Sequence, residues 1–264
     1  MKLFSIFGNP VSHSISPKMH NLALEGLHLN GCYIRTPLKD GSELINKFHS
    51  LKLDGANVTV PHKEFAYELC DKLDEFAQKT GAVNTLVKKQ NKIYGYNTDA
   101  PGFYKAIESF GNINTALILG AGGTSKAIAT ILKEKNIDVT VLNRSKNRLE
   151  YFKKNNIKSY SWEDFKLDSY ELIINTTSAG LSDNSLPLNK IILTELMKKS
   201  KYAFDVIYNK ETPFLKLALS NNLTCKDGAD MLLYQGVLAF NLFFDNTLND
   251  KQITKYMKGA FRAT

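Results

Sequence analysis

The chain has 264 residues, enough for one large domain or two modest ones, each with its own core. Its 43% hydrophobic and 23% charged residues are typical of a globular protein in water, and no apolar run approaches the roughly 20 residues of a membrane-spanning helix. The net charge of +8 suits an anionic partner, but the basic residues are spread out and do not interleave with aromatics, which disfavours nucleic acid.

Cysteines and histidines predict neither disulfides nor a metal site. The three cysteines are odd in number and form no CxxC pair, and the five histidines do not have a metal-ligand spacing such as HExxH. The N-terminal "MKLFSIFGNP" is predicted to be a first strand entering a glycine turn rather than a signal peptide. We therefore expect a cytoplasmic protein without a metal.

The first hundred residues alternate short strands with helices. The predicted strands are 3–7, 32–36, 57–60, 81–87 and 93–99. One helix is predicted to start with Ser16 as N-cap and Pro17 at N1, a second follows Ser42, and a third covers 63–79. A polar turn at 88–92 adds a hairpin near the end of a mostly parallel sheet.

A second series of strands and helices begins near residue 115. Its predicted strands are 115–120, 138–143, 171–175, 202–207 and 222–225, and its predicted helices are 124–135, 146–155, 229–244 and 250–262. The fold class is therefore α/β, with two α/β domains, a cleft between them, and a Rossmann-like second domain. Ligands of such folds bind beyond the carboxyl ends of the strands.

The stretch "ILGAGGTSKAIA" joins a buried strand to a helix and predicts a dinucleotide site. Gly120 permits the tight turn, and Gly122 and Gly123 let the backbone approach a pyrophosphate at the helix N-terminus. The fingerprint G-x-G-x-x-G is incomplete because Ser125 replaces its last glycine, so a purely structural turn remains an alternative.

The end of the next strand indicates which dinucleotide binds. NAD enzymes usually place an acidic residue there for the ribose 2′-OH, whereas this chain has "NRSKNR", with Arg144, Lys146 and Arg148. Cations at a helix N-terminus oppose the helix dipole unless an anion binds them. We therefore predict NADP rather than NAD.

Four stretches of the first domain, "GNPVSHSISP", "NVTVPHK", "GAVNT" and "YNTD", are predicted to follow strands. Each polar residue in them has an ordinary structural interpretation, such as N-cap or turn former. Together they suit a small ligand with hydroxyls and a carboxylate. The residues are Ser14, Ser16, Thr59, Lys63, Asn84 and Asp99.

With these motifs the sequence resembles the shikimate dehydrogenase family, which reduces 3-dehydroshikimate with NADPH. The resemblance runs the whole length of the chain and also includes "INTTSAG", "IYNKETPFL" and "DGADMLLYQG". It implies a substrate-binding catalytic domain of residues 1–100 plus 231–264, and an inserted NADP-binding domain of residues 101–230. Ala100 and Val206 depart from the glycine and the methionine that are common in the family.

The resemblance also implies roles for individual residues. Lys63 would be the catalytic acid/base, paired with Asp99. The substrate would be held by Ser14 and Ser16 at its carboxylate and by Thr59, Asn84, Asp99, Gln235 and Tyr208 around its ring. The cofactor would be bound by Gly120, Ala121, Gly122, Gly123, Thr124, Asn143, Arg144, Ser145, Lys146, Asn147 and Arg148, with Val206, Gly228 and Glu75 near the nicotinamide.

Several alternatives remain open at this point. His62, next to Lys63, is a rival acid/base because its reference pKa suits neutral pH. A quinate dehydrogenase that uses NAD and a non-catalytic ligand-binding regulator are alternative functions for the same fold. Either a monomer or a homodimer is compatible with the sequence.

Overall fold

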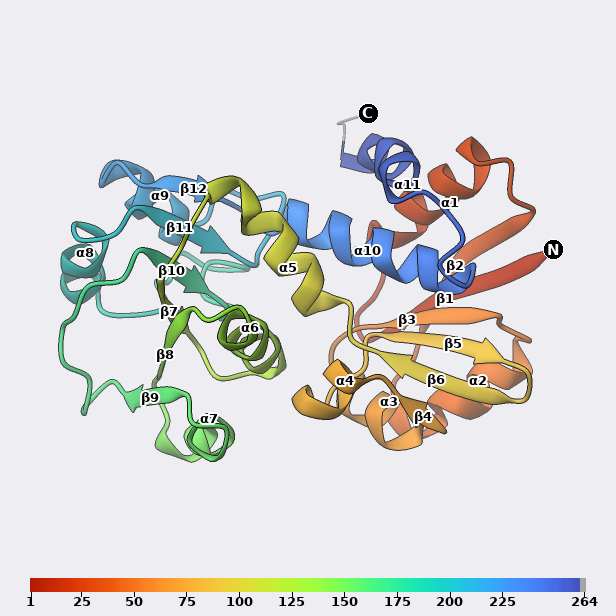
Figure 1. Cartoon of the computed structure of the whole chain (residues 1–264), viewed down its shortest axis with the longest axis horizontal. Helices are drawn as coiled ribbons and strands as arrows, with labels where there is room; N and C mark the ends of the chain where they lie inside the picture. Colours follow the sequence, from red (N-terminus) through yellow and green to blue (C-terminus); the bar gives the residue numbers. More distant parts are fainter. Residues whose placement is uncertain (262–264) are drawn as a thin grey trace. The chain divides into compact units, whose positions relative to one another are not determined.

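The computed structural model describes residues 1–261, and the chain divides into two compact units (Figure 1). The first unit is Met1–Gly102 with Leu233–Thr264, and the second is Phe103–Leu232. Two helices, α5 (Asp99–Ile107) and α10 (Ala229–Phe243), each begin in one unit and end in the other. The ligand of each unit stays a prediction at this stage.

The first unit contains a six-stranded mixed sheet in the order β2-β1-β3-β5-β6-β4. Its strands are β1 (Lys2–Gly8), β2 (Gly31–Pro37), β3 (Gly55–Val58), β4 (Lys72–Leu73), β5 (Thr85–Lys89) and β6 (Lys92–Tyr96). Strands β2, β1 and β3 are parallel, whereas β5 is antiparallel to both β3 and β6. The predicted mostly parallel sheet with a hairpin is confirmed, and Figure 1 shows the hairpin as β5 and β6.

Helices lie on both faces of this sheet. They are α1 (Ser16–Gly26), α2 (Leu44–Ser50), α3 (Lys63–Leu69), α4 (Glu75–Thr80), α10 and α11 (Asp250–Met257), with short 3₁₀ turns at Gly41–Glu43 and Lys258–Phe261. On the face of α2, α3 and α4, buried apolar side chains from the helices and strands form one core. On the opposite face, the ring of Phe243 in α10 stacks on Phe4 of β1 at 4.7 Å between centroids.

The predicted helix over 63–79 is wrong, because the chain breaks it at Cys70, which is extended with φ −77 and ψ 142. The next residues form the edge strand β4, where the Asp71 and Asp74 amides donate to carbonyls of Ile93 and Gly95. The Asp74 side chain then caps α4 by accepting from the Ala77 N–H at 2.8 Å. Pairing with β6 therefore outweighs local helical periodicity in this segment.

Other boundaries shift by smaller amounts. Helix α1 begins at Ser16 itself, so that Ile15 is the N-cap and the predicted serine cap is wrong. The predicted helix 146–155 is a 3₁₀ turn, Lys146–Leu149, followed by the short α7 (Glu150–Lys154). Residue 262, the predicted end of the last helix, lies outside the described residues.

The second unit is a six-stranded sheet in the order β12-β11-β10-β7-β8-β9, parallel throughout. Its strands are β7 (Thr115–Leu119), β8 (Asp138–Asn143), β9 (Lys158–Ser161), β10 (Leu172–Asn175), β11 (Tyr202–Asp205) and β12 (Thr224–Lys226). Its other helices are α6 (Gly123–Glu134), α8 (Lys190–Met197), α9 (Pro213–Ser220) and the 3₁₀ turn Glu108–Phe110. Strand β9 and helices α8 and α9 were not predicted from the sequence.

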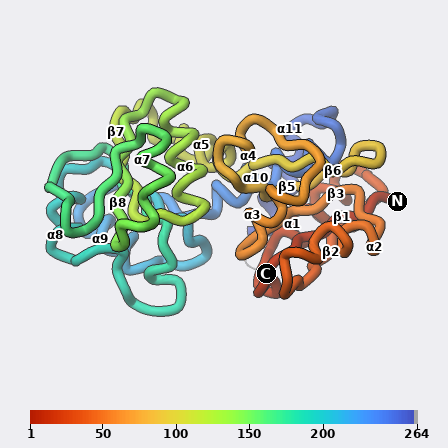
Figure 2. The backbone as a smooth tube through the Cα atoms, turned by 90° about the horizontal axis from the view of Figure 1, so that it is seen from below, coloured from red at the N-terminus to blue at the C-terminus, as the bar shows by residue number. Residues whose placement is uncertain are grey.

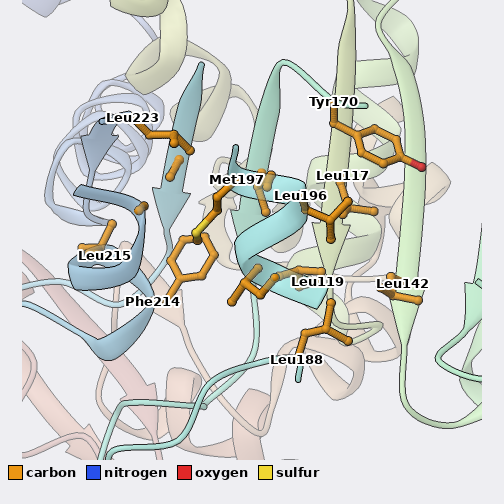
Figure 3. Close-up of a cluster of buried hydrophobic side chains, with 14 residues drawn as sticks. Leu117, Leu119, Leu142, Tyr170, Leu188, Leu196, Met197, Phe214, Leu215 and Leu223 are labelled. Carbon is orange, nitrogen blue, oxygen red and sulfur yellow. The ribbon is translucent and has the colours of Figure 1, made fainter. Parts of the chain in front are cut away.

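The main core of the second unit packs α8 and α9 against the sheet. Figure 3 shows Met197 of α8 beside Phe214 of α9, with Leu117 and Leu119 of β7 on the neighbouring sheet surface. These side chains are at most 1% exposed. Burial of such apolar surface, at roughly 25 cal/mol per Å², is the main force that holds the helices on the sheet.

Helices α5 and α10 cross at very short range where both still belong to the first unit. A Cβ added to Gly102 of α5 would lie 2.6 Å from the backbone nitrogen of Gln235 in α10. No larger residue fits there without moving a backbone. The two helices can be followed as separate tubes in Figure 2.

Replacing Gly102 with alanine tests this crossing. Gly→Ala inside a helix usually stabilises by about 0.5–1 kcal/mol, but here we expect a loss of about 2 kcal/mol because the methyl group overpacks the crossing. The measurement is chemical denaturation of Gly102→Ala against Gly259→Ala, whose added Cβ would meet only the movable Leu22 side chain at 3.3 Å. A Gly102→Ala protein at least as stable as the parent would contradict the close crossing.

The stability of the folded protein should depend on pH through Glu171, the residue directly before β10. Glu171 accepts from Lys201 Nζ at 2.8 Å and from the Asn114 N–H at 2.6 Å, and these bonds lower the pKa of Glu171 to about 2. A lowered folded-state pKa stabilises the protein above the unfolded value of 4.5, and this contribution is lost as pH falls toward about 2. Because water reaches the Glu171–Lys201 pair, we expect Glu171 to contribute about 1 kcal/mol to the free energy of unfolding at neutral pH.

The variant Glu171→Gln should therefore unfold more easily than the parent at pH 7, with a difference that shrinks as the pH is lowered below about 4.5. Urea denaturation across that range measures it. Glu195→Gln, which removes an exposed carboxylate paired with Lys198, should change little at any pH. An equal loss at every pH would mean that packing rather than charge accounts for the effect of Glu171.

Candidate functional site

The carboxyl edge of the first sheet gathers the predicted substrate residues. Gly8, Pro37 and Val58 end the parallel strands β1, β2 and β3 at the same edge. Asn84 was predicted to follow a strand, but it directly precedes β5. Because β5 runs antiparallel to β3, its start lies beside the end of β3, and the Val58 N–H donates to the Asn84 carbonyl at 2.8 Å. Strand β6 returns to the same edge and delivers Asp99.

Lys63 and Asp99 form an ion pair at this edge. Lys63 is the first residue of α3 and Asp99 the first of α5, and Lys63 Nζ lies 2.5 Å from Asp99 Oδ2. The two side chains are 21% and 14% exposed, so the pair is largely shielded but still reachable. A pair in such surroundings leaves a poorly solvated charge when one partner is removed.

The carboxamide of Asn84 holds the other oxygen of Asp99. Its Nδ2 donates to Asp99 Oδ1 at 2.9 Å and lies 3.5 Å from Gln235 Oε1. Its Oδ1 accepts from the Thr98 N–H at 2.8 Å, which sets the amide orientation. The structure therefore brings Lys63, Asp99, Asn84 and Gln235 together.

Ser14, in the loop after β1, and Ser16, the first residue of α1, form a second polar group. Ser14 Oγ donates to Ser16 Oγ at 3.2 Å, and both residues are at least nine-tenths buried. Arg35, which the sequence interpretation missed, donates from Nη2 to the Ser14 carbonyl at 2.6 Å and holds this loop. Thr59 is half-buried after β3, and its N–H donates to the Phe7 carbonyl at 2.8 Å.

His62 points away from Lys63. It is 1% exposed, and its Nε2 donates to the Leu38 carbonyl at 2.6 Å. Its Nδ1 has no hydrogen-bond partner within the described part of the chain, and Gly41 packs so closely that an added Cβ would lie 2.8 Å from it. A buried ring held this way is poorly placed to exchange protons with a ligand.

The glycine-rich turn of the second unit lies between β7 and α6. Gly120 has φ +112, and a Cβ there would lie 2.7 Å from Thr176 Oγ1, so this position requires glycine. Nothing lies within 4 Å of a Cβ added at Gly122 or Gly123, so their outward side is open. Ser125 Oγ accepts from the Gly122 N–H at 3.1 Å and contacts Thr176 Oγ1 at 2.7 Å, so the serine that departs from the fingerprint fastens the turn.

A pocket of about 500 Å³ opens beside this turn at the carboxyl ends of β7, β8 and β10. Among the predicted cofactor residues it is lined by Gly120, Ala121, Gly122, Asn143, Arg144 and Arg148. Thr176, Thr177 and Trp162 also line it and were not predicted; Trp162 follows β9, a strand too short and polar for its pattern to stand out. Open glycine backbone, two arginines and a pocket of this size fit a dinucleotide with an additional phosphate.

Lys146 belongs to the same basic loop but makes other contacts. Its Nζ lies 3.2 Å from Asp164 Oδ2 and 3.3 Å from Glu163 Oε2. The residues that line the pocket do not include Lys146, Ser145 or Asn147. Thr124, the second residue of α6, is half-buried and directly follows Gly123. Arg144 and Arg148 are therefore the cations of this loop that face the pocket.

Two of the residues predicted near the nicotinamide lie just beyond neighbouring strands, Val206 after β11 and Gly228 after β12. Gly228 packs against Val206, since a Cβ added to Gly228 would lie 2.2 Å from the Val206 carbonyl oxygen. Tyr208 lies two residues after Val206 in the chain. Buried Asp205 orders this turn by accepting from Thr212 Oγ1 at 2.6 Å and from the Ile207 N–H at 3.1 Å. Burial raises the pKa of Asp205 and also that of Tyr208.

Glu75 lies apart from these groups as the structure describes them. It is the first residue of α4, its side chain is 83% exposed, and its carboxylate pairs with Lys79 at 2.7 Å. Its predicted contact with the nicotinamide stays a prediction. Within residues 1–261, no three acidic, histidine or cysteine side chains are grouped to hold a metal, and no helix is long and apolar enough to cross a membrane.

Comparisons with known proteins show which family this chain belongs to. Residues 6–86 match the family model "Shikimate dehydrogenase substrate binding domain", and residues 105–205 match "Shikimate / quinate 5-dehydrogenase". A shikimate dehydrogenase (NADP(+)) of Helicobacter hepaticus is 48% identical over 248 residues, which is 93% of this chain and 92% of that protein. One from Helicobacter pylori strain P12 is 41% identical over 99% of each chain.

Solved structures show the same likeness. Shikimate 5-dehydrogenase of Thermus thermophilus in complex with NADP(H) and shikimate has a TM-score of 0.86 at 34% identity, covering 99% of this chain and 100% of that chain. The shikimate dehydrogenase of Aquifex aeolicus has a TM-score of 0.87 at 31% identity, covering 100% and 98%. The resemblance seen in the sequence is confirmed, and the chain belongs to the shikimate dehydrogenase family.

Proposed function

We propose that this protein catalyses the reversible reduction of 3-dehydroshikimate to shikimate with NADPH. As a member of this family it is an NADP-dependent oxidoreductase. The observation that carries the finer proposal is the Lys63–Asp99 ion pair at the carboxyl edge of the first sheet, next to Asn84 and Gln235. We place the reaction in the cytoplasm, in the supply of chorismate for aromatic amino acids, on the strength of the family.

Each unit takes one ligand in this proposal. Residues 1–100 plus 231–264 bind the substrate and residues 101–230 bind NADP. The buried hydroxyls of Ser14 and Ser16, at the N-terminus of α1, bind the substrate carboxylate, which the helix dipole also favours. Thr59, Asn84 and Gln235 bind the ring hydroxyls, and Tyr208 contacts the substrate from the second unit.

Lys63 supplies the proton in the reductive direction. When bound, NADPH provides the hydride that reduces the substrate ketone. The Lys63 ammonium protonates the oxygen that becomes an alkoxide, and in the reverse direction neutral Lys63 removes that proton. Asp99 holds the Lys63 Nζ in place and is itself oriented by the Asn84 amide. His62 has no part in this transfer because its ring is buried against Leu38.

Cofactor selection follows from the basic loop after β8. Arg144 and Arg148 line the pocket and bind the 2′-phosphate, while the open backbone of Gly122 and Gly123 binds the pyrophosphate. A second function, oxidation of quinate with NAD, is favoured only by the combined shikimate and quinate description of the second family model.

Steady-state assays with shikimate or quinate, each with NADP or NAD, test the function. We expect the highest kcat/KM for shikimate with NADP, because two arginines face the pocket and would pair with the 2′-phosphate. Preference for quinate with NAD would support the second function. If all four combinations fail while shikimate still binds, the protein is a non-catalytic ligand-binding regulator and the proposal is wrong.

The acid/base role is tested with Lys63→Ala. We expect kcat to fall by about 10²- to 10⁴-fold, with a smaller change in KM, because proton transfer is lost while the other substrate contacts remain. The matched control is Lys18→Ala, an exposed lysine on α1 of the same unit, which should keep the parental kcat. A folded Lys63→Ala protein with most of its kcat would exclude this role.

A further inference from the structure

We infer that Trp162 forms an aromatic wall of the cofactor pocket, against which the adenine ring packs. This inference rests on the proposed use of NADP and adds to it a binding residue outside the glycine-rich turn and the basic loop. Trp162 is the sole tryptophan of the chain, is 42% exposed, and lines the 500 Å³ pocket.

Strand register brings Trp162 and Arg144 to the same end of the sheet. Strands β8 and β9 are parallel, and Asn143 of β8 pairs with Ser161 of β9. Arg144 and Trp162 are the first residues after the ends of these two strands. Since neighbouring strands lie about 4.8 Å apart, the two side chains start from adjacent points of the pocket rim.

The turn that carries Trp162 is held firmly. Buried Ser161 donates from Oγ to Asp164 Oδ2 at 2.6 Å, and the Asp164 N–H donates to the Ser161 carbonyl at 3.2 Å. Lys146 then bridges from the basic loop to Asp164 and Glu163. Lys146 therefore contacts this turn, whereas Arg144 and Arg148 line the pocket.

The charged and aromatic side chains that line this part of the pocket suit an adenosine 2′-phosphate. Arg144 and Arg148 provide two charges for the phosphate, and an exposed indole offers a flat apolar surface for a purine. Base–aromatic stacking contributes affinity that corresponds to roughly 5- to 150-fold in Kd. A wall of this kind lowers KM for the cofactor without taking part in the transfer of hydride or proton.

Intrinsic fluorescence tests the contact directly, because all tryptophan emission comes from Trp162. The probe is 2′,5′-ADP, which has the adenine and the 2′-phosphate but not the dihydronicotinamide ring of NADPH, which absorbs at the wavelength of tryptophan emission. We expect it to change the emission saturably and to compete with NADP, whereas nicotinamide mononucleotide should leave the emission unchanged.

The KM for NADP of single-residue variants gives a second test. Trp162→Ala should raise the KM for NADP by about 5- to 150-fold with kcat nearly unchanged, and Trp162→Phe should recover part of the affinity. The matched control is Tyr160→Ala, which removes a 41% exposed aromatic side chain of β9, two residues before Trp162. Tyr160 does not line this pocket, so this variant should keep the parental KM.

The outcomes separate this inference from the proposed function. If NADP is reduced normally but 2′,5′-ADP leaves the emission unchanged, or Trp162→Ala keeps the parental KM, the inference is wrong and the function stands. If the protein reduces neither NADP nor NAD but 2′,5′-ADP still changes the emission, the wall is supported and the function is wrong.

Discussion

The proposed substrate site depends on the hydrogen bonds of one buried carboxamide, that of Asn84. Its Oδ1 accepts from the Thr98 N–H, and its Nδ2 donates to Asp99, which in turn binds Lys63. A buried amide that lost these partners would cost about 1–3 kcal/mol, so its orientation is strongly determined. The start of β5 is thereby tied to Asp99 at the start of α5, and through Asp99 to Lys63 at the start of α3.

The proposed cofactor site depends on a similarly small set of polar groups around the turn after β7. Thr176 Oγ1 donates to the Leu119 carbonyl and contacts Ser125, so β7, β10 and α6 meet at two hydroxyls. This leaves the backbone of Gly122 and Gly123 facing open space. In the basic loop, carboxylates of Glu163 and Asp164 bind Lys146, and Arg144 and Arg148 line the pocket.

Secondary structure was predicted best where a single segment has a clear pattern of apolar and charged residues. The apolar run before Gly120 was correctly predicted as a buried strand, and the basic run at 143–148 was correctly placed at the end of the next one, because local composition and periodicity report burial. The prediction failed at 63–79, where pairing of β4 with β6 breaks a helical pattern, and it missed β9, whose polar edge residues carry no strong pattern. Trp162 was missed with it.

By itself the sequence determined the family, the α/β class, the glycine turn and the identity of Lys63 as a candidate acid. Only the tertiary structure decided that Asn84 joins Lys63 and Asp99, that His62 is buried against Leu38, and that Lys146 binds carboxylates. The physical reason is that these contacts join residues far apart in the chain. Their geometry follows from strand direction and register, which local composition does not encode.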